Sequence, residues 1–190
     1  QTSWGVSWRL IGAMIMAHGD DKGLVLPPKV APMQVVIVPI YRNDEGKEIV
    51  LPKVEEIKKE LESKDIRVHV DEREGLSPGY KFNDWELKGV PLRIEIGPKD
   101  IEKNSIVVAK RYNLEKISLG FTEIEKIPTI LDEIQVEMLK KSKEEAKKNT
   151  LEISDYSDFK SKIEKGGFFN SPWCGKLECE EKIKEETGAE

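Results

Sequence analysis

The sequence feature that most constrains the fold is the short apolar run QVVIVPI at residues 34–40. β-branched residues without polar alternation predict a strand buried on both faces, as in parallel or mixed sheets. After a turn at residues 43–46, an amphipathic helix is predicted over residues 52–64, and the alternating residues 66–70 predict a half-buried strand. Strands and helices in this order indicate an α/β domain in which helices cover a mixed sheet.

Residues 71–100 interleave apolar and charged side chains more closely than any other stretch. Pro78, early in a helical pattern, predicts a short helix that the GVP turn at residues 89–91 ends. Apolar residues then alternate with Arg93 and Glu95, so we expect a strand with one core face and one outward, charged face. A turn is expected at residues 97–100.

Later segments complete this domain. Strands are predicted at residues 105–109 and 116–119, and a long amphipathic helix from residue 127 runs into a charged end near residue 148. After that the chain changes character, because Gly, Pro, aromatic residues and both cysteines gather in one small unit. We therefore expect three parts, at residues 1–31, 32–148 and 149–190.

The first of these parts is short but distinctive. Residues 10–17 are apolar all round, which predicts a helix that is buried on every side. His18-Gly19-Asp20-Asp21 ends it, either as a plain helix stop or, less simply, as part of a metal site. Pro27, Pro28 and Pro32 predict an extended linker.

Composition limits the function classes. The chain has 190 residues, 35% of them charged, and a net charge of −5, which argues weakly against indiscriminate nucleic-acid binding. Residues 81–116 nevertheless hold eight Lys or Arg against six Asp or Glu, so a local basic surface is possible there. The apolar runs are too short to span a bilayer, and no membrane partner is expected.

Common catalytic motifs are absent from the sequence: it has no P-loop, dinucleotide fingerprint, GxSxG elbow or HExxH. Arg9 stands at the entrance of the apolar helix, where its forked, planar guanidinium suits a phosphate or a nucleotide base, or serves only as an ion pair. Cys174 and Cys179 form a C-x4-C pair, which is a weak signal for a metal and equally fits free thiols.

Three motifs together resemble one family. TSWGVSWRLIGAMIMAHGDDKGLVLPP resembles the third signature motif of class II aminoacyl-tRNA synthetases, in detail that of prolyl-tRNA synthetases of the archaeal and eukaryotic cytoplasmic type. PGYKFNDWELKGVPLRIEIGPKDI is similar to their anticodon-binding domain, and PWCGKLECEEKIKEETG to the start of their C-terminal zinc-binding domain. The resemblance covers essentially the whole chain, with the motifs in the family's order.

This resemblance implies that Arg9 contacts ATP as the motif 3 arginine and that Ser7 lines the same pocket. Trp8 departs from the small residue expected there. The proline pocket and most of the ATP site would lie before Gln1, so this chain alone is expected not to activate proline. The longer enzyme would attach proline to its tRNA with ATP and Mg²⁺ through a prolyl-adenylate, as a cytoplasmic homodimer.

The resemblance also implies an anticodon-reading surface. Proline anticodons share two guanines, and a splayed RNA loop needs an aromatic face and side chains that read base edges. The residues that match the family are Phe82, Glu86, Arg93, Lys99, Asp100 and Lys116. Phe82 and Glu86 lie one helical turn apart and face the same way, whereas Trp85 is expected to pack in the core.

Cys174 and Cys179 would hold a structural zinc ion, with further family cysteines beyond Glu190. Two other hypotheses remain open: a non-catalytic, synthetase-like RNA-binding module, and a purely structural or partner-binding α/β domain.

Overall fold

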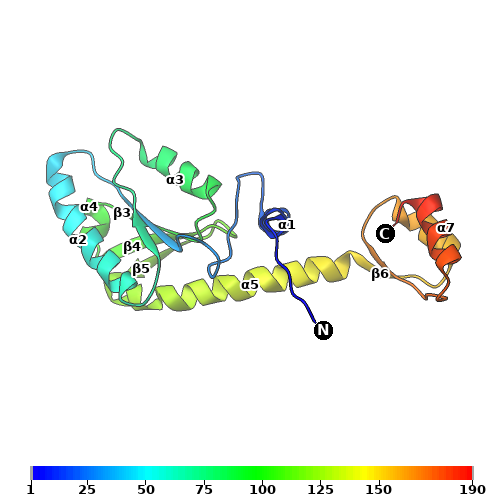
Figure 1. The fold of residues 1–190 in the computed structure, drawn as a ribbon. Coiled ribbons are helices and arrows are strands. Elements are labelled where there is room, and N and C mark those ends of the chain that lie inside the picture. The colour runs from blue at the N-terminus through cyan, green and yellow to red at the C-terminus, as the bar shows by residue number, and fades with distance from the viewer. Residues whose placement is uncertain (1, 190) are drawn as a thin grey trace. The chain divides into compact units, whose positions relative to one another are not determined.

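A computed structural model describes residues 2–189 (Figure 1). The chain separates into two compact units, which meet in sequence between Leu139 and Lys140. The boundaries expected after residues 31 and 148 stay predictions. Within the described range, each helix is too short or too polar to traverse a lipid bilayer.

The first unit is built on a five-stranded sheet with the order β2-β1-β3-β4-β5. Strand β1 pairs in parallel with its neighbours β2 and β3, and β4 pairs antiparallel with both β3 and β5. The predicted mixed sheet is therefore confirmed, and every residue of β1 is buried as expected. The strands are β1 (Val35–Pro39), β2 (Val68–Val70), β3 (Leu92–Ile96), β4 (Ser105–Lys110) and β5 (Lys116–Gly120).

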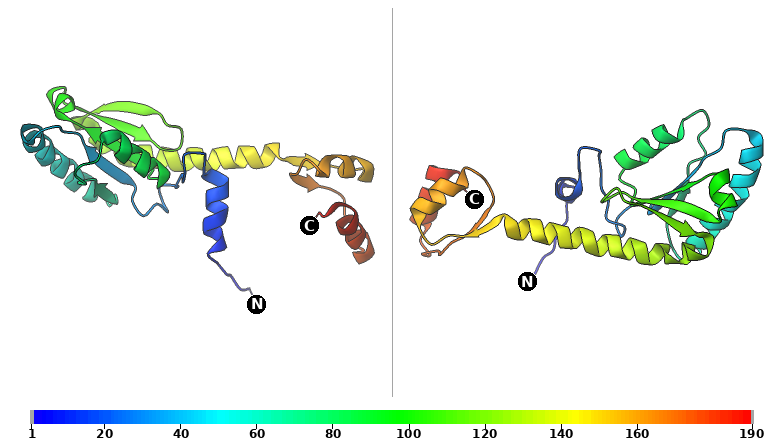
Figure 2. Two further views of the ribbon diagram at one scale, coloured as in Figure 1. Left: turned by 90° about the horizontal axis from the view of Figure 1, so that it is seen from above. Right: turned by 180° about the vertical axis from the view of Figure 1, so that it is seen from behind.

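Helices cover both faces of this sheet (Figures 1 and 2). On one face Ile37, Ile94 and Val108 pack in the main core with α2 (Asp44–Glu62), the 3-10 helix η1 (Phe121–Lys126) and α5 (Ile127–Lys148). On the other face Val36 and Val38 pack with Trp85 of α3 (Pro78–Leu87). Since α3 contacts β1 and is a short helix, it leaves the β4–β5 side of its face less covered.

Two predicted turns are helix starts instead. The Asn43 side chain accepts a hydrogen bond from Gly46 N at 3.0 Å, so the helix begins at Asp44 and runs through Pro52, where the prediction began it. Asp100 accepts from Gly97 N at 2.8 Å and starts the short helix α4 (Pro98–Glu102). Asn and Asp favour both turns and helix N-caps because their side-chain oxygens accept hydrogen bonds from nearby backbone N–H groups. Gly favours both because its backbone adopts conformations that other residues avoid.

The extended linker predicted from the prolines before β1 is only partly present: residues 24–27 lie in no helix or turn, whereas residues 28–30 form a turn in which Val30 N and Ala31 N both donate to Pro27 O at 3.0 Å. This segment is also held by hydrogen bonds to the sheet domain. Leu24 N donates to Leu87 O at 3.0 Å and Leu26 N to Gly89 O at 3.2 Å. Further along, Arg67 donates from Nε to Ala31 O and from Nη2 to Pro28 O, both at 3.0 Å. The prolines therefore mark a segment fixed to the sheet domain.

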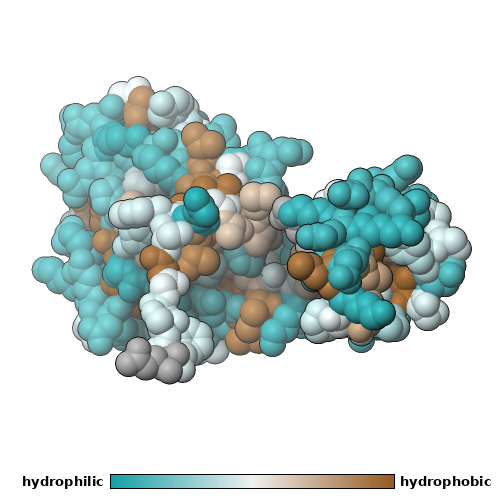
Figure 3. Space-filling view, turned by 45° about the vertical axis from the view of Figure 1, so that its right-hand side comes forward, coloured by the Kyte–Doolittle hydropathy of each residue, from teal (hydrophilic) through white to brown (hydrophobic). Residues whose placement is uncertain are grey.

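The apolar helix of the first part is α1 (Arg9–His18). Its expected all-round burial is not met by the described residues, because Leu10, Ile11, Ile15 and Met16 are exposed. Figure 3 shows such hydrophobic residues at the surface among hydrophilic ones.

The second unit is small. Strands β6 (Thr150–Glu152) and β7 (Phe168–Asn170) pair in parallel beside α6 (Tyr156–Ile163) and α7 (Leu177–Thr187). The predicted helix at Tyr156–Ile163 is confirmed, and its Phe159 packs edge-on against Phe169 with ring centroids 5.5 Å apart. Tyr156 donates to Glu186, and that hydrogen bond raises the pKa of Tyr156 to about 12.

Candidate nucleic-acid interface

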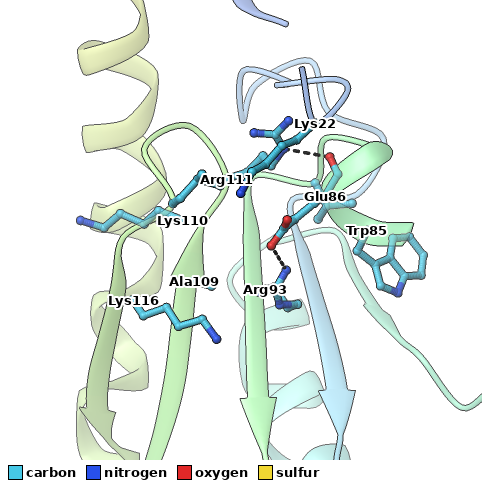
Figure 4. Close-up of a pocket in the computed structure, with 10 residues that line it drawn as sticks. Lys22, Trp85, Glu86, Arg93, Ala109, Lys110, Arg111 and Lys116 are labelled. Atoms are coloured by element: carbon cyan, nitrogen blue, oxygen red, sulfur yellow. Dashed lines mark hydrogen bonds and ion pairs between the residues drawn. The ribbon is translucent and has the colours of Figure 1, made fainter. Parts of the chain in front are cut away.

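A cavity of about 220 Å³ lies where the end of α3 meets strands β3, β4 and β5 (Figure 4). Its position follows from the partial cover that α3 gives to this face of the sheet. The lining is mostly polar or cationic and consists of Lys22, Trp85, Glu86, Val90, Arg93, Ala109, Lys110, Arg111, Leu114 and Lys116.

Strand register explains the cavity floor. Arg93 pairs with Ala109, and Ala109 pairs with Lys116, so the three residues form one row across neighbouring strands. Successive residues in a row stand on the same face of a sheet. The small Ala109 side chain leaves open the space between two long cationic ones, which Figure 4 shows on either side of it.

Arg93 is the centre of the site and is only 6% exposed. Its Nη1 donates to Glu86 Oε1 at 2.9 Å, and its Nε and Nη2 donate to Glu95 Oε1 at 3.1 and 3.0 Å. The guanidinium lies 4.3 Å from the ring centroid of Phe82. Phe82 and Glu86 therefore do face the same way, as their spacing predicted.

The expectation that Arg93 and Glu95 point outward into solvent is wrong. Both stand on the face opposite Leu92 and Ile94, as alternation predicts, but α3 packs over that face and Glu95 is only 8% exposed. Alternation assigns a side chain to a face and cannot tell whether a helix covers that face.

Glu95 is a functional candidate that the residue-by-residue match to the family did not select. Besides Arg93, it accepts from Lys116 Nζ at 2.8 Å, and that ammonium lies 5.4 Å from the Phe82 ring. The Lys116 side chain is 51% exposed. The signal that could have found Glu95 is its place two residues from Arg93, on the same strand face.

Two predicted residues lie apart from this cluster. Lys99 and Asp100 belong to α4, which follows the carboxyl end of β3, whereas Arg93 lies near the start of that strand. Neither residue lines the cavity. The structure thus brings together Phe82, Glu86, Arg93 and Lys116 of the predicted set, and adds Glu95, Lys22, Lys110 and Arg111 near them.

Trp85 packs in the core, as predicted, and is tied to a buried carboxylate. Its Nε1 donates to Asp71 Oδ2 at 2.7 Å. Asp71 is 0% exposed and also pairs with Arg73 at 2.7 Å and with Lys81 at 3.6 Å. Burial alone would raise the pKa of Asp71, but hydrogen bonds from Arg73 and Trp85 outweigh it and hold that pKa well below its usual range.

Ser7 and Arg9 both lie exposed at the start of α1, where Arg9 N donates to Ser7 Oγ at 3.4 Å. The helix ends at His18, as predicted. Asp20 binds Arg111 rather than forming part of a metal site: Oδ1 accepts from Nη2 at 2.6 Å and Oδ2 from Nη1 at 2.8 Å. This ion pair lowers the pKa of Asp20 to about 2.

Cys174 and Cys179 are both exposed, and a hydrogen bond with Cys174 raises the pKa of the Cys179 thiol. A structural zinc ion usually takes about four nitrogen or sulfur ligands. Among residues 2–189, no group of at least three His, Cys, Asp or Glu gathers in metal-binding geometry. The two thiols alone are too few for such a site, and among residues 2–189 no third ligand joins them.

The side chains at this site combine hydrogen-bond donors, acceptors and an aromatic face. Carboxylates accept from the N–H groups of guanine, and a guanidinium beside an aromatic ring offers both donors and a stacking plane. Glu86, Arg93 and Lys116 line the cavity, and Glu95 pairs with Arg93 and Lys116 beside it. A ligand in the cavity could therefore exchange with these internal ion pairs.

Comparisons with known proteins identify both parts of the chain. Residues 34–129 match the family described as "Anticodon binding domain", and residues 156–190 match "Prolyl-tRNA synthetase, C-terminal". The chain is 53% identical to a proline–tRNA ligase of Acetoanaerobium sticklandii over 98% of its own length and 39% of the relative. It is 52% identical to one of Cenarchaeum symbiosum over 100% of its length and 40% of that relative.

A solved structure agrees as well. The prolyl-tRNA synthetase of Cryptosporidium parvum, complexed with L-proline and AMP, superposes with a TM-score of 0.88 at 43% identity. The match covers 95% of this chain and 39% of that one, so the chain spans about two fifths of the length of these relatives. From the α/β sheet domain to the small second unit, the chain belongs to the prolyl-tRNA synthetase family, of which it carries the C-terminal region.

Proposed function

We propose that this chain selects proline tRNA by binding the two guanines that proline anticodons share. The observation that carries the proposal is the cluster of Phe82, Glu86 and Arg93 at the edge of a polar cavity. Single-stranded RNA is recognised by stacking and by hydrogen bonds to base edges, and this cluster supplies both.

Each residue has a role that its chemistry supports. Glu86 accepts from the N–H edge of one guanine, and Arg93 donates to guanine O6 and N7 or stacks on the base. The Phe82 ring packs against the Arg93 guanidinium and holds it in place. Lys116 holds a phosphate, because half of its side chain is exposed beside the cluster. Lys99 and Asp100 contact a second nucleotide from α4, apart from the cavity.

The longer protein would be an ATP-dependent proline–tRNA ligase that works through a prolyl-adenylate with Mg²⁺. In it, residues 1–31 would close the catalytic domain, with Arg9 and Ser7 at ATP, and residues 32–148 would form the anticodon-binding domain. Residues 149–190 would begin the zinc-binding domain, whose remaining ligands would lie beyond residue 190. We further propose a cytoplasmic homodimer. The support for these proposals is the family membership and the order of the motifs.

The test measures binding of the 190-residue chain to two RNA hairpins by fluorescence anisotropy. One hairpin carries a proline anticodon, and in the other the two shared guanines are adenines. Glu86→Ala and Arg93→Ala should each weaken binding of the guanine hairpin by about 1–3 kcal/mol and remove the preference for guanine. The control is Glu72→Ala, which removes an exposed carboxylate in the loop between β2 and α3. If both variants bind the guanine hairpin like the parent, the proposal is wrong.

A further inference from the structure

The segment after α1 is joined to the end of α3 by close backbone contacts. Asp20 and Gly23 pair with each other through Asp20 N to Gly23 O at 3.1 Å and Gly23 N to Asp20 O at 3.0 Å. Leu24 and Leu26 then bond to the end of α3 as described above. We call residues 20–26 the strap.

Glycines make this contact possible on both sides. Gly23 has φ of 123°, and a Cβ there would lie 2.6 Å from Leu87 O. Gly89 has φ of 72°, and a Cβ there would lie 2.6 Å from the Leu24 backbone. Both positions need a residue without a side chain. The strap and the end of α3 therefore meet backbone to backbone.

Arg111 fastens this joint to the sheet. It is 4% exposed, its backbone N donates to Pro91 O at 2.9 Å, and its forked guanidinium grips Asp20 through both oxygens. Its Nε donates to Glu86 O at 2.8 Å, a contact drawn in Figure 4. One guanidinium thus contacts both the strap and the backbone of the residue that binds Arg93.

We propose that Arg111 is a positioning residue, held by Asp20, that sets the direction in which Glu86 presents its carboxylate to RNA. The inference rests on the proposed function, because it assigns a purpose to the orientation of Glu86. The strap directly follows α1, so this joint also links the helix that begins at Arg9 to the RNA site.

The charges show why Asp20 matters to this arrangement. A buried guanidinium that loses its carboxylate partner keeps an uncompensated charge, and it moves toward water or other acceptors. Arg111 would then release Glu86 O, whose remaining acceptor bonds, from Gly89 N at 3.0 Å and from Lys88 N, do not reach the sheet. The end of α3 would turn more freely, and the Glu86–Arg93 pair would lose its fixed geometry.

The experiment is a double-mutant cycle on the affinity of the 190-residue chain for the guanine hairpin. Asp20→Asn should weaken binding about tenfold. This factor equals about 1.4 kcal/mol, which lies within the range of interaction energies between contacting residues. In the Glu86→Ala background, Asp20→Asn should cause no further loss, because the group that Asp20 positions is gone. Asp20→Glu, which keeps the charge, should restore part of the affinity. Asp21→Asn, the exposed neighbour, is the matched control and should bind like the parent.

The outcomes separate the two proposals. If Glu86→Ala itself has no effect, the proposed function fails. If Glu86→Ala weakens binding and Asp20→Asn does not, the inference about Arg111 is wrong while the proposed function stands. An equal loss from Asp20→Asn in both backgrounds would show a general effect on the fold and would overturn the inference.

Discussion

Helix α3 contacts two clusters in which buried carboxylates pair with Arg and Lys. One cluster encloses its carboxylate, and the other lies beside a cavity. At one, Asp71 is fully enclosed and meets Arg73, Lys81 and the Trp85 indole. At the other, Arg93 meets Glu86 and Glu95 at the edge of a cavity, and Lys116 reaches Glu95 from the exposed side.

The difference lies in what closes each cluster. Asp71 finds its partners within the protein and lines no cavity itself, although Arg73 and Lys81 line a neighbouring cavity of about 280 Å³, so the Asp71 carboxylate serves to hold α3 beside β2. The Arg93 cluster adjoins the small Ala109 and the uncovered side of the sheet, so its charges can exchange partners. Buried charge alone therefore does not mark a binding site; access through a cavity does.

The largest expected effect belongs to the closed cluster. Asp71→Asn should lower the free energy of unfolding by about 3–5 kcal/mol, because it leaves buried Lys81 without its anionic partner. Urea unfolding measures this change. Asp84→Asn, which removes a partly exposed partner of Arg73 and Lys88, is the matched control and should cost about 1 kcal/mol or less. A loss below 1 kcal/mol for Asp71→Asn would show that the cluster is not structural.

The second prediction tests the open cluster. Ala109→Leu should place a larger side chain in the cavity and weaken binding of the guanine hairpin by about 1–3 kcal/mol, the value of a base contact. The free energy of unfolding should change by less than about 1 kcal/mol, because the cavity accepts the added volume. Anisotropy and urea unfolding of the same sample check both statements. Unchanged RNA affinity would mean that RNA does not enter this cavity.

A smaller effect is expected at Lys116. Lys116→Ala should weaken the guanine and adenine hairpins alike and reduce the slope of log affinity against log salt by about one, as for a phosphate contact. Titrations at several salt concentrations measure the slope. Lys126→Ala, a cation that pairs with Glu123 on η1, provides the comparison and should leave the slope unchanged. A loss confined to the guanine hairpin would instead assign Lys116 to base recognition.

The smallest effect concerns acid. The pKa of Asp20 falls from 3.8 to about 2 on folding because Arg111 stabilises its ionised form. Its contribution to stability is complete above the unfolded pKa and is lost as the pH falls through the folded one. The stability difference between the parent chain and Asp20→Asn should therefore shrink between about pH 4 and pH 2, as urea unfolding would show. A difference that stays constant over this range would argue against the ion pair.

Much of the fold could be predicted because periodicity reports burial directly. The β-branched run at residues 34–40 and the alternation at residues 92–96 both lie in strands of the expected mixed sheet. The sequence could not distinguish a helix start from a plain turn at Asn43 or Asp100, because the same side-chain to backbone hydrogen bond stabilises both.

The candidate site was only partly predictable, because it depends on contacts far apart in the chain. Resemblance selected Glu86 and Arg93, and the structure places them in contact. It did not select Glu95, whose importance appears only when α3 covers its strand face. Asp20 looked like a helix stop because its partner, Arg111, lies ninety-one residues later in the sequence. Local patterns carry no signal for such a pair.

The hydrogen bonds from Arg67 to the proline-rich segment determine where a shorter fragment of this protein should begin. A fragment that begins at residue 32 would lose the carbonyls of Pro28 and Ala31, to which Arg67 donates. It would also lose Asp20 and leave the Arg111 guanidinium without its carboxylate. A fragment that begins before Asp20 keeps both contacts, and its resistance to limited proteolysis should exceed that of the shorter one.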